Sequence, residues 1–296
     1  MKTIVITAKA ALLGAFAMVA AEAMADVPAN YYRAASGKSG AELKTALHNI
    51  IYNHTEISSY QALPDYFRRT DVYPPQDERY GQWWDMYSDI PLYTNTFWGL
   101  NREHAFPKSW WGGSTATPAY IDLYHLYPSE QAANMAKSNY PLGEVLNPSF
   151  DNGITRVGTA ILGQGGGAKA VFEPDDEYKG DFARTYFYMA TCYQNLTWKY
   201  TYMVSNNTYP TLSDWAAKML LKWHQEDPVS QKEIDRNETV YRIQANRNPF
   251  IDYPELAEYL WGSRKGQTWT PGSIPTEPTG TPTLITPVQG LSLIHI

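Results

Sequence analysis

Apolar residues recur every three to four positions in several parts of the chain. This spacing places them on one face of a helix, where they can be buried together. Ser39 precedes the first of these segments as a candidate N-cap, and the last one begins at Asp227 or Ser230. The pattern predicts helices within residues 38–57, 180–195, 211–225 and 228–244.

Two shorter apolar stretches, around residues 96–106 and 119–127, predict strands. The second stretch is followed by "PSEQAANMAKSNYPLG", in which Ser129 is a candidate helix cap and Pro141 lies beyond the expected helix end. The pattern therefore predicts a strand, a turn, a second strand and a short helix in direct succession.

Both ends of the chain differ in composition from the part between them. Residues 1–25 combine two lysines, an apolar run and a small-residue end, which is typical of a cleaved secretory signal. Residues 264–290 are rich in Pro, Thr and Gly, and we interpret them as a linker. The last six residues, 291–296, match the translation of a sequencing-library adapter, so we expect the natural chain to continue differently. The domain to explain is 26–263.

Charge and cysteine content narrow the classes of function. The formal net charge of −6 argues against a non-specific electrostatic grip on nucleic acid, so phosphate chemistry would need a local site and a metal. Cys192 is the single cysteine of the chain, which excludes an intrachain disulfide. No apolar run after the expected signal is long enough to span a bilayer, and we expect an exported, soluble protein.

The stretch "LNREHAFPKSWWGG", residues 100–113, places Glu103 directly before His104 in a predicted strand. Adjacent side chains on a regular strand point to opposite faces. Because Pro107 limits the ladder, we expect the pair to lie near a strand end, where both side chains can converge. The strand–strand–helix order would place Asn134 close to Glu103 and His104. A carboxylate, an imidazole and an amide oxygen suit metal-assisted hydrolysis of a phosphodiester.

Several separated motifs, found in the right order, resemble the endonuclease I family of secreted or periplasmic nucleases. They are "LNREHAFPKSWWGG", "AYIDLYHLYPSEQAANMAKSNYPLGEV", "FEPDDEYKGDFARTYFYMA" and "NRNPFIDYPELAEYLWG". The resemblance spans nearly all of the domain. It implies an α+β fold, in which a His-Me finger (ββα-metal) core is embedded in a mainly helical single domain.

The same resemblance implies roles for three residues. His104 would be the general base, held by a backbone contact so that one nitrogen faces the attacking water. Glu103 and Asn134 would be the protein ligands of one Mg²⁺, with Mn²⁺ or Ca²⁺ as alternatives. We therefore expect a secreted, monomeric, largely sequence-independent endonuclease that cleaves DNA, RNA or both to 5′-phosphate and 3′-hydroxyl ends.

One feature of the family pattern is missing. Some family members have a phosphate-binding Arg between the two strands, but the segment "WGGSTATPAY" contains no Arg. The candidate phosphate contacts are therefore Lys137, Arg102 and Lys108.

A secreted module that binds or acts on glycans is the alternative, because the chain is acidic and 14% aromatic. Such a module would stack sugars on exposed aromatic rings. An open aromatic groove far from His104, lined by Trp83, Trp84, Trp110 and Trp111, would support this alternative.

Overall fold

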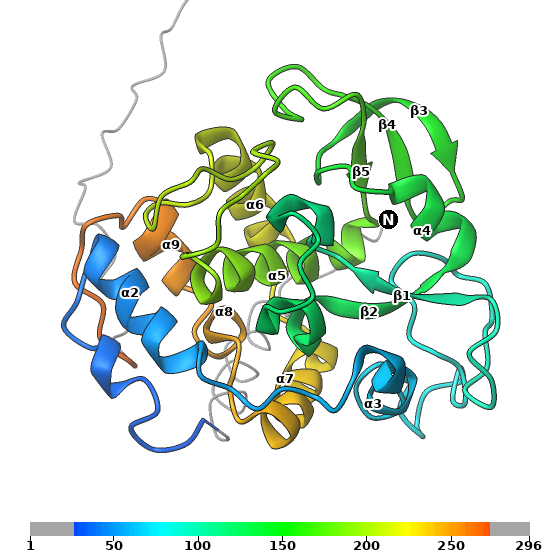
Figure 1. The fold of residues 1–296 in the computed structure, drawn as a ribbon, viewed down its shortest axis with the longest axis horizontal. Coiled ribbons are helices and arrows are strands. Elements are labelled where there is room, and N and C mark those ends of the chain that lie inside the picture. Colours follow the sequence, from blue (N-terminus) through cyan, green and yellow to red (C-terminus); the bar gives the residue numbers. More distant parts are fainter. Residues whose placement is uncertain (1–26, 273–296) are drawn as a thin grey trace, which may run out of the picture.

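The computed structural model describes residues 27–272 (Figure 1). The expected signal at 1–25, residues 273–290 of the expected linker and the segment 291–296 lie outside this range. Helix α5 (Lys179–Cys192) runs through the middle of the ribbon, and nearly all of its side chains are buried. Between residues 27 and 272, no helix has the length and apolar character needed to cross a membrane.

The four helical patterns of the sequence correspond to α2 (Gly40–Ile51), α5, α6 (Asp214–Glu226) and α7 (Gln231–Gln244). α7 begins after Ser230, whose side chain forms a capping box with Glu233, so Ser230 rather than Asp227 starts this helix. Ser39 is the N-cap residue of α2, although its side chain makes no capping hydrogen bond. The sequence pattern did not predict three further helices of the described chain, α3 (Leu63–Thr70), α8 (Pro249–Asp252) and α9 (Leu256–Trp261).

The two predicted strands pair with each other. β1 (Leu100–His104) and β2 (Leu126–Glu130) are antiparallel, with Glu103 opposite Tyr127 and His104 opposite Leu126. Helix α4 (Gln131–Lys137) follows at once and packs against both strands. The molecule thus mixes helices and strands, and it contains the predicted strand–strand–helix succession on one side of α5 (Figure 1).

The second strand starts later than its apolar pattern predicts. Residues 119–125 lie mostly in two short 3₁₀ turns, η4 (Pro118–Ile121) and η5 (Leu123–His125). Asp122 separates the turns, and its side chain accepts a hydrogen bond from the backbone N–H of Tyr124. This local competition by a short polar side chain favours a turn over a ladder.

The predicted cap of α4 is wrong. Ser129 lies inside β2, where it pairs with Asn101. The N-cap is Glu130, whose carboxylate accepts hydrogen bonds of 2.8 Å from the backbone N–H groups of Ala132 and Ala133. A carboxylate at this position satisfies two free amides and interacts favourably with the positive end of the helix.

A second sheet was not predicted. β3 (Val145–Asp151), β4 (Arg156–Ala160) and β5 (Val171–Glu173) form an antiparallel sheet in the order β3-β4-β5. Most of β3 is exposed and it contains Pro148, so its sequence lacks the alternation that marks a half-buried strand.

The packed part of the chain extends past residue 263. Trp269 lies in the segment interpreted as a linker, yet its side chain is fully buried. Its backbone N–H donates to the carbonyl of Lys38, and its carbonyl accepts from the N–H of Gly37. Its ring meets the edges of Tyr32 and Tyr253.

Candidate active site

His104, the last residue of β1, is held by the main chain of η4. Its Nε2 lies 3.0 Å from the carbonyl oxygen of Tyr120. A carbonyl can only accept, so Nε2 carries the hydrogen and Nδ1 has the free lone pair. The backbone contact thereby selects the tautomer in which Nδ1 can accept a proton.

Aromatic rings surround this imidazole. Tyr60 lies parallel to it, with ring centroids 5.6 Å apart and planes 7° apart. Tyr120 is stacked at 5.6 Å and 21°, and Trp111 meets it edge-on at 5.9 Å. The hydroxyl of Tyr60 also donates to the carbonyl of Arg102 at 2.8 Å. The ring of His104 is therefore fixed in orientation on several sides.

The surroundings keep His104 neutral. Its side chain is only 8% exposed, and this burial lowers its pKa well below the usual value. The nearby His125 and the ammonium groups of Lys108 and Lys137 lower the pKa further, while the hydrogen bond to Tyr120 opposes them. A neutral imidazole at pH 7 has the protonation state that a general base requires.

Glu103 contacts helix α4. The Nζ of Lys137 lies 2.5 Å from Glu103 Oε1 and 3.4 Å from the carbonyl oxygen of His104. Burial raises the pKa of Glu103, and the ammonium of Lys137 counteracts this shift. Lys137 itself is fully buried. The structure therefore does not support Lys137 as a phosphate contact, because its ammonium is enclosed and bound to a carboxylate.

The expected irregularity at the Glu103–His104 pair is not present. β1 and β2 pair regularly through His104, and the N–H of Ala105 still donates to the carbonyl of His125 at 2.9 Å. Glu103 and His104 accordingly have separate partners, one on α4 and one on η4.

Asn134 lies one turn before Lys137 on α4, on the same side of the helix. Its side chain is half-buried, and its amide makes no hydrogen bond to any residue in 27–272. The structure records no hydrogen bond between Asn134 and Glu103. A carboxylate and an unpaired amide oxygen are hard donors of the kind that Mg²⁺ prefers, so the two residues fit the expected ion.

Two further cations lie beside the rings around His104. The guanidinium of Arg102 is 5.6 Å from the ring centroid of Tyr60 and 5.5 Å from that of Phe97. Its Nε is buried without a hydrogen-bond partner in the described chain. The ammonium of Lys108 is 5.3 Å from the ring of Tyr120. Within residues 27–272, neither cation forms an ion pair with a carboxylate, so both are free to meet an anionic substrate.

The aromatic groove that would support the glycan alternative is not formed by these four tryptophans. Trp83, Trp110 and Trp111 are buried. Trp84 is half-buried, and its indole N–H donates to the hydroxyl of Tyr178 at 3.1 Å. Trp111 packs against His104 rather than far from it.

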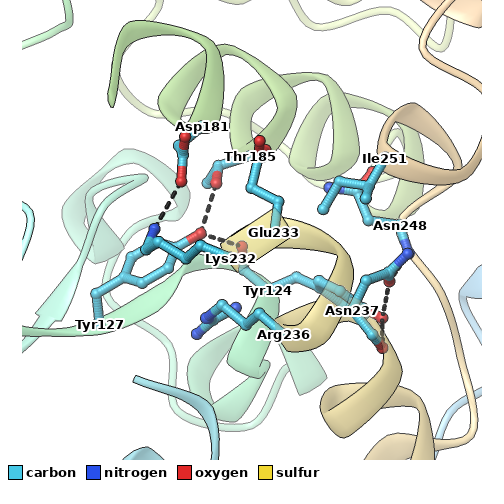
Figure 2. A pocket seen from close by; sticks show the side chains of 10 residues that line it. All are labelled: Tyr124, Tyr127, Asp181, Thr185, Lys232, Glu233, Arg236, Asn237, Asn248 and Ile251. Carbon is cyan, nitrogen blue, oxygen red and sulfur yellow. Dashed lines mark hydrogen bonds and ion pairs between the residues drawn. The ribbon is translucent and has the colours of Figure 1, made fainter. Parts of the chain in front are cut away.

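A small polar cavity between α5 and α7 contains none of the predicted site residues (Figure 2). Lys232 is 2.6 Å from Asp181, and the hydroxyls of Tyr127 and Thr185 are 2.7 Å apart. Its other charged groups are paired as well, Arg236 with Asp71 and Glu233 with Arg184. These interactions tie the helices together, so the cavity is a poor candidate for substrate binding.

One other group in residues 27–272 has the composition of a metal site. Ligand atoms of His54, Asp122 and Cys192 lie within 4.8 Å of one another. Both oxygens of Asp122 already accept hydrogen bonds, from Tyr188 and Tyr193 at one oxygen and from the main chain and Gln244 at the other. This group shares no residue with the predicted ligands. The hydrogen bonds to its carboxylate explain why Asp122 is buried at this position.

Sequence reasoning did not identify Tyr60 and Tyr120 as part of this site. Tyr60 comes from a 3₁₀ turn, η2 (Tyr60–Ala62), far from His104 in the chain. Tyr120 contributes a carbonyl, which every residue type possesses. Neither contribution leaves a signature in one sequence.

Comparison with known proteins connects this geometry to a family. The model of the family Endonuclease I matches residues 39–255. The chain is 37% identical over 244 residues to a protein named extracellular ribonuclease from Bacillus amyloliquefaciens. It is 34% identical over 244 residues to a protein of the same name from Bacillus subtilis (strain 168), and both alignments cover 78% of this chain and of the relative.

A shorter similarity extends to endonuclease-1 of Buchnera aphidicola subsp. Acyrthosiphon pisum (strain APS). The two chains are 28% identical over 130 residues, which is 44% of each. The family match spans most of the chain and confirms the resemblance seen in its motifs. The chain therefore belongs to the endonuclease I family, and it is an enzyme that hydrolyses nucleic acid.

Proposed function

We propose that this chain is an exported, Mg²⁺-dependent endonuclease of the His-Me finger type with His104 as its general base. The observation that carries the proposal is the hydrogen bond from His104 Nε2 to the carbonyl of Tyr120. It leaves Nδ1 as the acceptor in a buried, neutral imidazole. The antiparallel β1–β2 pair with α4 packed on both strands supports a ββα-metal core.

In this proposal, Nδ1 of His104 takes a proton from the water that attacks the phosphorus. The stacked rings of Tyr60 and Tyr120 limit rotation of the imidazole, so the base does not need to be oriented during the reaction. Attack with loss of the 3′-oxygen yields a 5′-phosphate and a 3′-hydroxyl. A positioned base of this kind contributes about two to four powers of ten in rate.

Glu103 and Asn134 would hold one Mg²⁺ through a carboxylate and an amide oxygen. When bound, the ion would neutralise the negative charge that develops on the phosphate and on the leaving oxygen. Lys137 has a different task, because its ammonium holds Glu103 in place from inside the protein. Arg102 and Lys108 are then the candidate contacts for substrate phosphates.

The relatives support the choice of substrate and location. Two of them are named extracellular ribonuclease and one endonuclease-1, so we propose export and cleavage of RNA, DNA or both. The net charge of −6 leaves few phosphate contacts available, which favours a shallow salt dependence. The sequence contains no recognition-helix signature that would read bases, so we expect largely sequence-independent cleavage. One chain carries all of the proposed site residues, so a monomer would suffice.

The test uses the purified mature chain with plasmid DNA and with structured RNA, in Mg²⁺ or in excess EDTA. His104→Ala is assayed beside the parent. Cleavage by the parent in Mg²⁺ alone, lost in the variant, is the expected result. Cleavage that persists in EDTA would overturn the metal requirement, and intact DNA and RNA in every lane would overturn the proposed function.

A further inference from the structure

Trp98 is the exposed tryptophan of this protein. Its side chain is 82% exposed, whereas the other tryptophans in residues 27–272 are buried or half-buried. A large indole in water forgoes the burial that aromatic rings usually obtain, so its position requires an explanation.

The backbone around Trp98 is well fixed. Gly99 follows it with a φ of +86°, a left-handed conformation that favours glycine. The carbonyl of Gly99 accepts from the N–H of Gln131 at 3.0 Å, and the N–H of Trp98 donates to Thr96 Oγ1 at 3.1 Å. The indole of the buried Trp83 donates to the carbonyl of Thr96 at 2.9 Å. Trp98 is thus held at the junction of β1 and α4.

A series of side-chain contacts connects this junction to His104, the proposed general base. The neighbour of Trp98, Phe97, lies 5.5 Å from the guanidinium of Arg102. The same guanidinium lies 5.6 Å from the ring of Tyr60, which stacks on His104. Arg102, which has no carboxylate partner in the described chain, therefore contacts both the ring next to Trp98 in the sequence and the ring that stacks on His104.

We propose that Trp98 stacks on a base of a single-stranded substrate whose backbone passes Arg102 on its way to His104. This inference rests on the proposed function and adds the class of substrate. Stacking on an aromatic ring is available to every base, but the bases of a duplex are already stacked on one another. A protein with net charge −6 would gain affinity from such stacking without many phosphate contacts.

The separation in the chain sets an upper limit on the distance between Trp98 and His104. Trp98 precedes His104 by six residues, which is at most roughly 20 Å, because Trp98 and Gly99 lie in a turn that shortens the extended path. Even at about twice the duplex rise of ~3.4 Å per nucleotide, a dinucleotide spans less than this limit, whereas a strand of twelve nucleotides exceeds it. Catalytic efficiency should therefore increase from a dinucleotide to a strand of twelve nucleotides.

Binding is measured first, with the His104→Ala chain in EDTA and fluorescein-labelled twelve-nucleotide DNA and RNA strands. Adding Trp98→Ala should weaken single-strand binding about five- to 150-fold, the usual effect of losing one stacked base. Trp98→Phe should retain most of the affinity. Tyr80→Ala removes another exposed ring, 64% exposed, and should change nothing. The salt slope should be unchanged in Trp98→Ala, because no phosphate contact is removed.

Turnover is measured second, on the chain with His104 intact. Trp98→Ala should raise KM for the twelve-nucleotide strand more than it lowers kcat, and it should reduce the gain in kcat/KM over the dinucleotide. Equal binding by Trp98→Ala and the parent would overturn the proposal. A change of oligomeric state in sedimentation, without loss of strand binding, would overturn it as well. A parent that cleaves no substrate would overturn the proposed function, while the binding assay would still decide the stacking.

Discussion

His104 Nε2 and the carbonyl oxygen of Tyr120 lie 3.0 Å apart, and this contact joins the end of β1 to η4. The acceptor belongs to the backbone, so the tautomer of His104 depends on the path of the main chain and not on the tyrosine side chain. Interactions that fix the path of this main chain therefore also fix the tautomer and orientation of His104. The predictions below follow from this arrangement and from the packing that supports it.

His104→Ala should lower kcat/KM by about two to four powers of ten, because the proton acceptor for water is removed. The measurement is steady-state cleavage in saturating Mg²⁺. The affinity for single strands in EDTA and the thermal unfolding midpoint should match those of the parent. Activity within about tenfold of the parent would remove His104 from the role of base.

Glu103→Gln and Asn134→Ala should each raise the Mg²⁺ concentration needed for half-maximal cleavage by at least about tenfold. Loss of residues that only support metal ligands already costs about 10- to 100-fold in metal affinity or activity. Mg²⁺ titrations of cleavage rate provide the measurement. A titration curve that coincides with that of the parent would exclude the residue as a ligand.

Asp122→Asn should weaken both folding and turnover. Asp122 Oδ2 accepts from the hydroxyls of Tyr188 and Tyr193 at 2.7 Å each, and Oδ1 accepts from Gln244 at 3.0 Å. An amide nitrogen facing these donors leaves some of them unpaired, at a cost of about 1–3 kcal/mol in the free energy of unfolding. Because Asp122 follows Tyr120 by two residues, the carbonyl that holds His104 should shift and kcat should fall. Unchanged denaturant unfolding would contradict this account.

Lys44 makes stability depend on pH. Its buried ammonium donates to Gln194 Oε1 at 3.0 Å, to the carbonyl of Thr208 at 2.8 Å and to Thr211 Oγ1 at 2.9 Å, and burial lowers its pKa to about 7. The ordinary pKa of lysine is about 10.4. Between these values the unfolded chain binds a proton that the folded chain does not.

The Lys44 contribution to the free energy of unfolding should therefore rise with pH from about 7 to about 10, by up to ~1.4 kcal/mol per pH unit. Below that window the lysine is charged in both states, and the slope from this group vanishes. Urea unfolding at a series of pH values measures the slope, which should be smaller in Lys44→Met. Lys218→Met on the exposed face of α6 controls for the loss of a positive charge. Identical slopes in the parent and Lys44→Met would contradict the prediction.

A chain that ends at residue 263 should be less stable than one that ends at residue 272. The shorter chain lacks Trp269, whose ring is fully buried against Tyr32 and Tyr253. Loss of a buried aromatic side chain costs about 3–5 kcal/mol, and Trp269→Ala in the longer chain should reproduce most of the effect. Denaturant midpoints compare the three proteins, and equal midpoints would show that the segment contributes nothing.

Local sequence patterns predicted most helices, because the burial of a helical face requires a period that one sequence displays. The sequence also predicted the succession of two strands and a helix. Its motifs identified Glu103, His104 and Asn134 as candidate site residues. The boundaries were less accurate where a side chain competes with the ladder or supplies an unexpected cap, as at Asp122 and Glu130.

Motifs along the chain determined the family and the residue types of the candidate site. Only the tertiary structure decided what surrounds those residues. It enclosed Lys137 against Glu103, brought Tyr60 onto His104 and left Trp98 in the solvent. Exposure and long-range contact depend on how distant segments pack, and a residue type alone does not record them. The carbonyl of Tyr120 is the clearest case, because a backbone atom has no identity in the sequence and acquires a role only from its place in the fold.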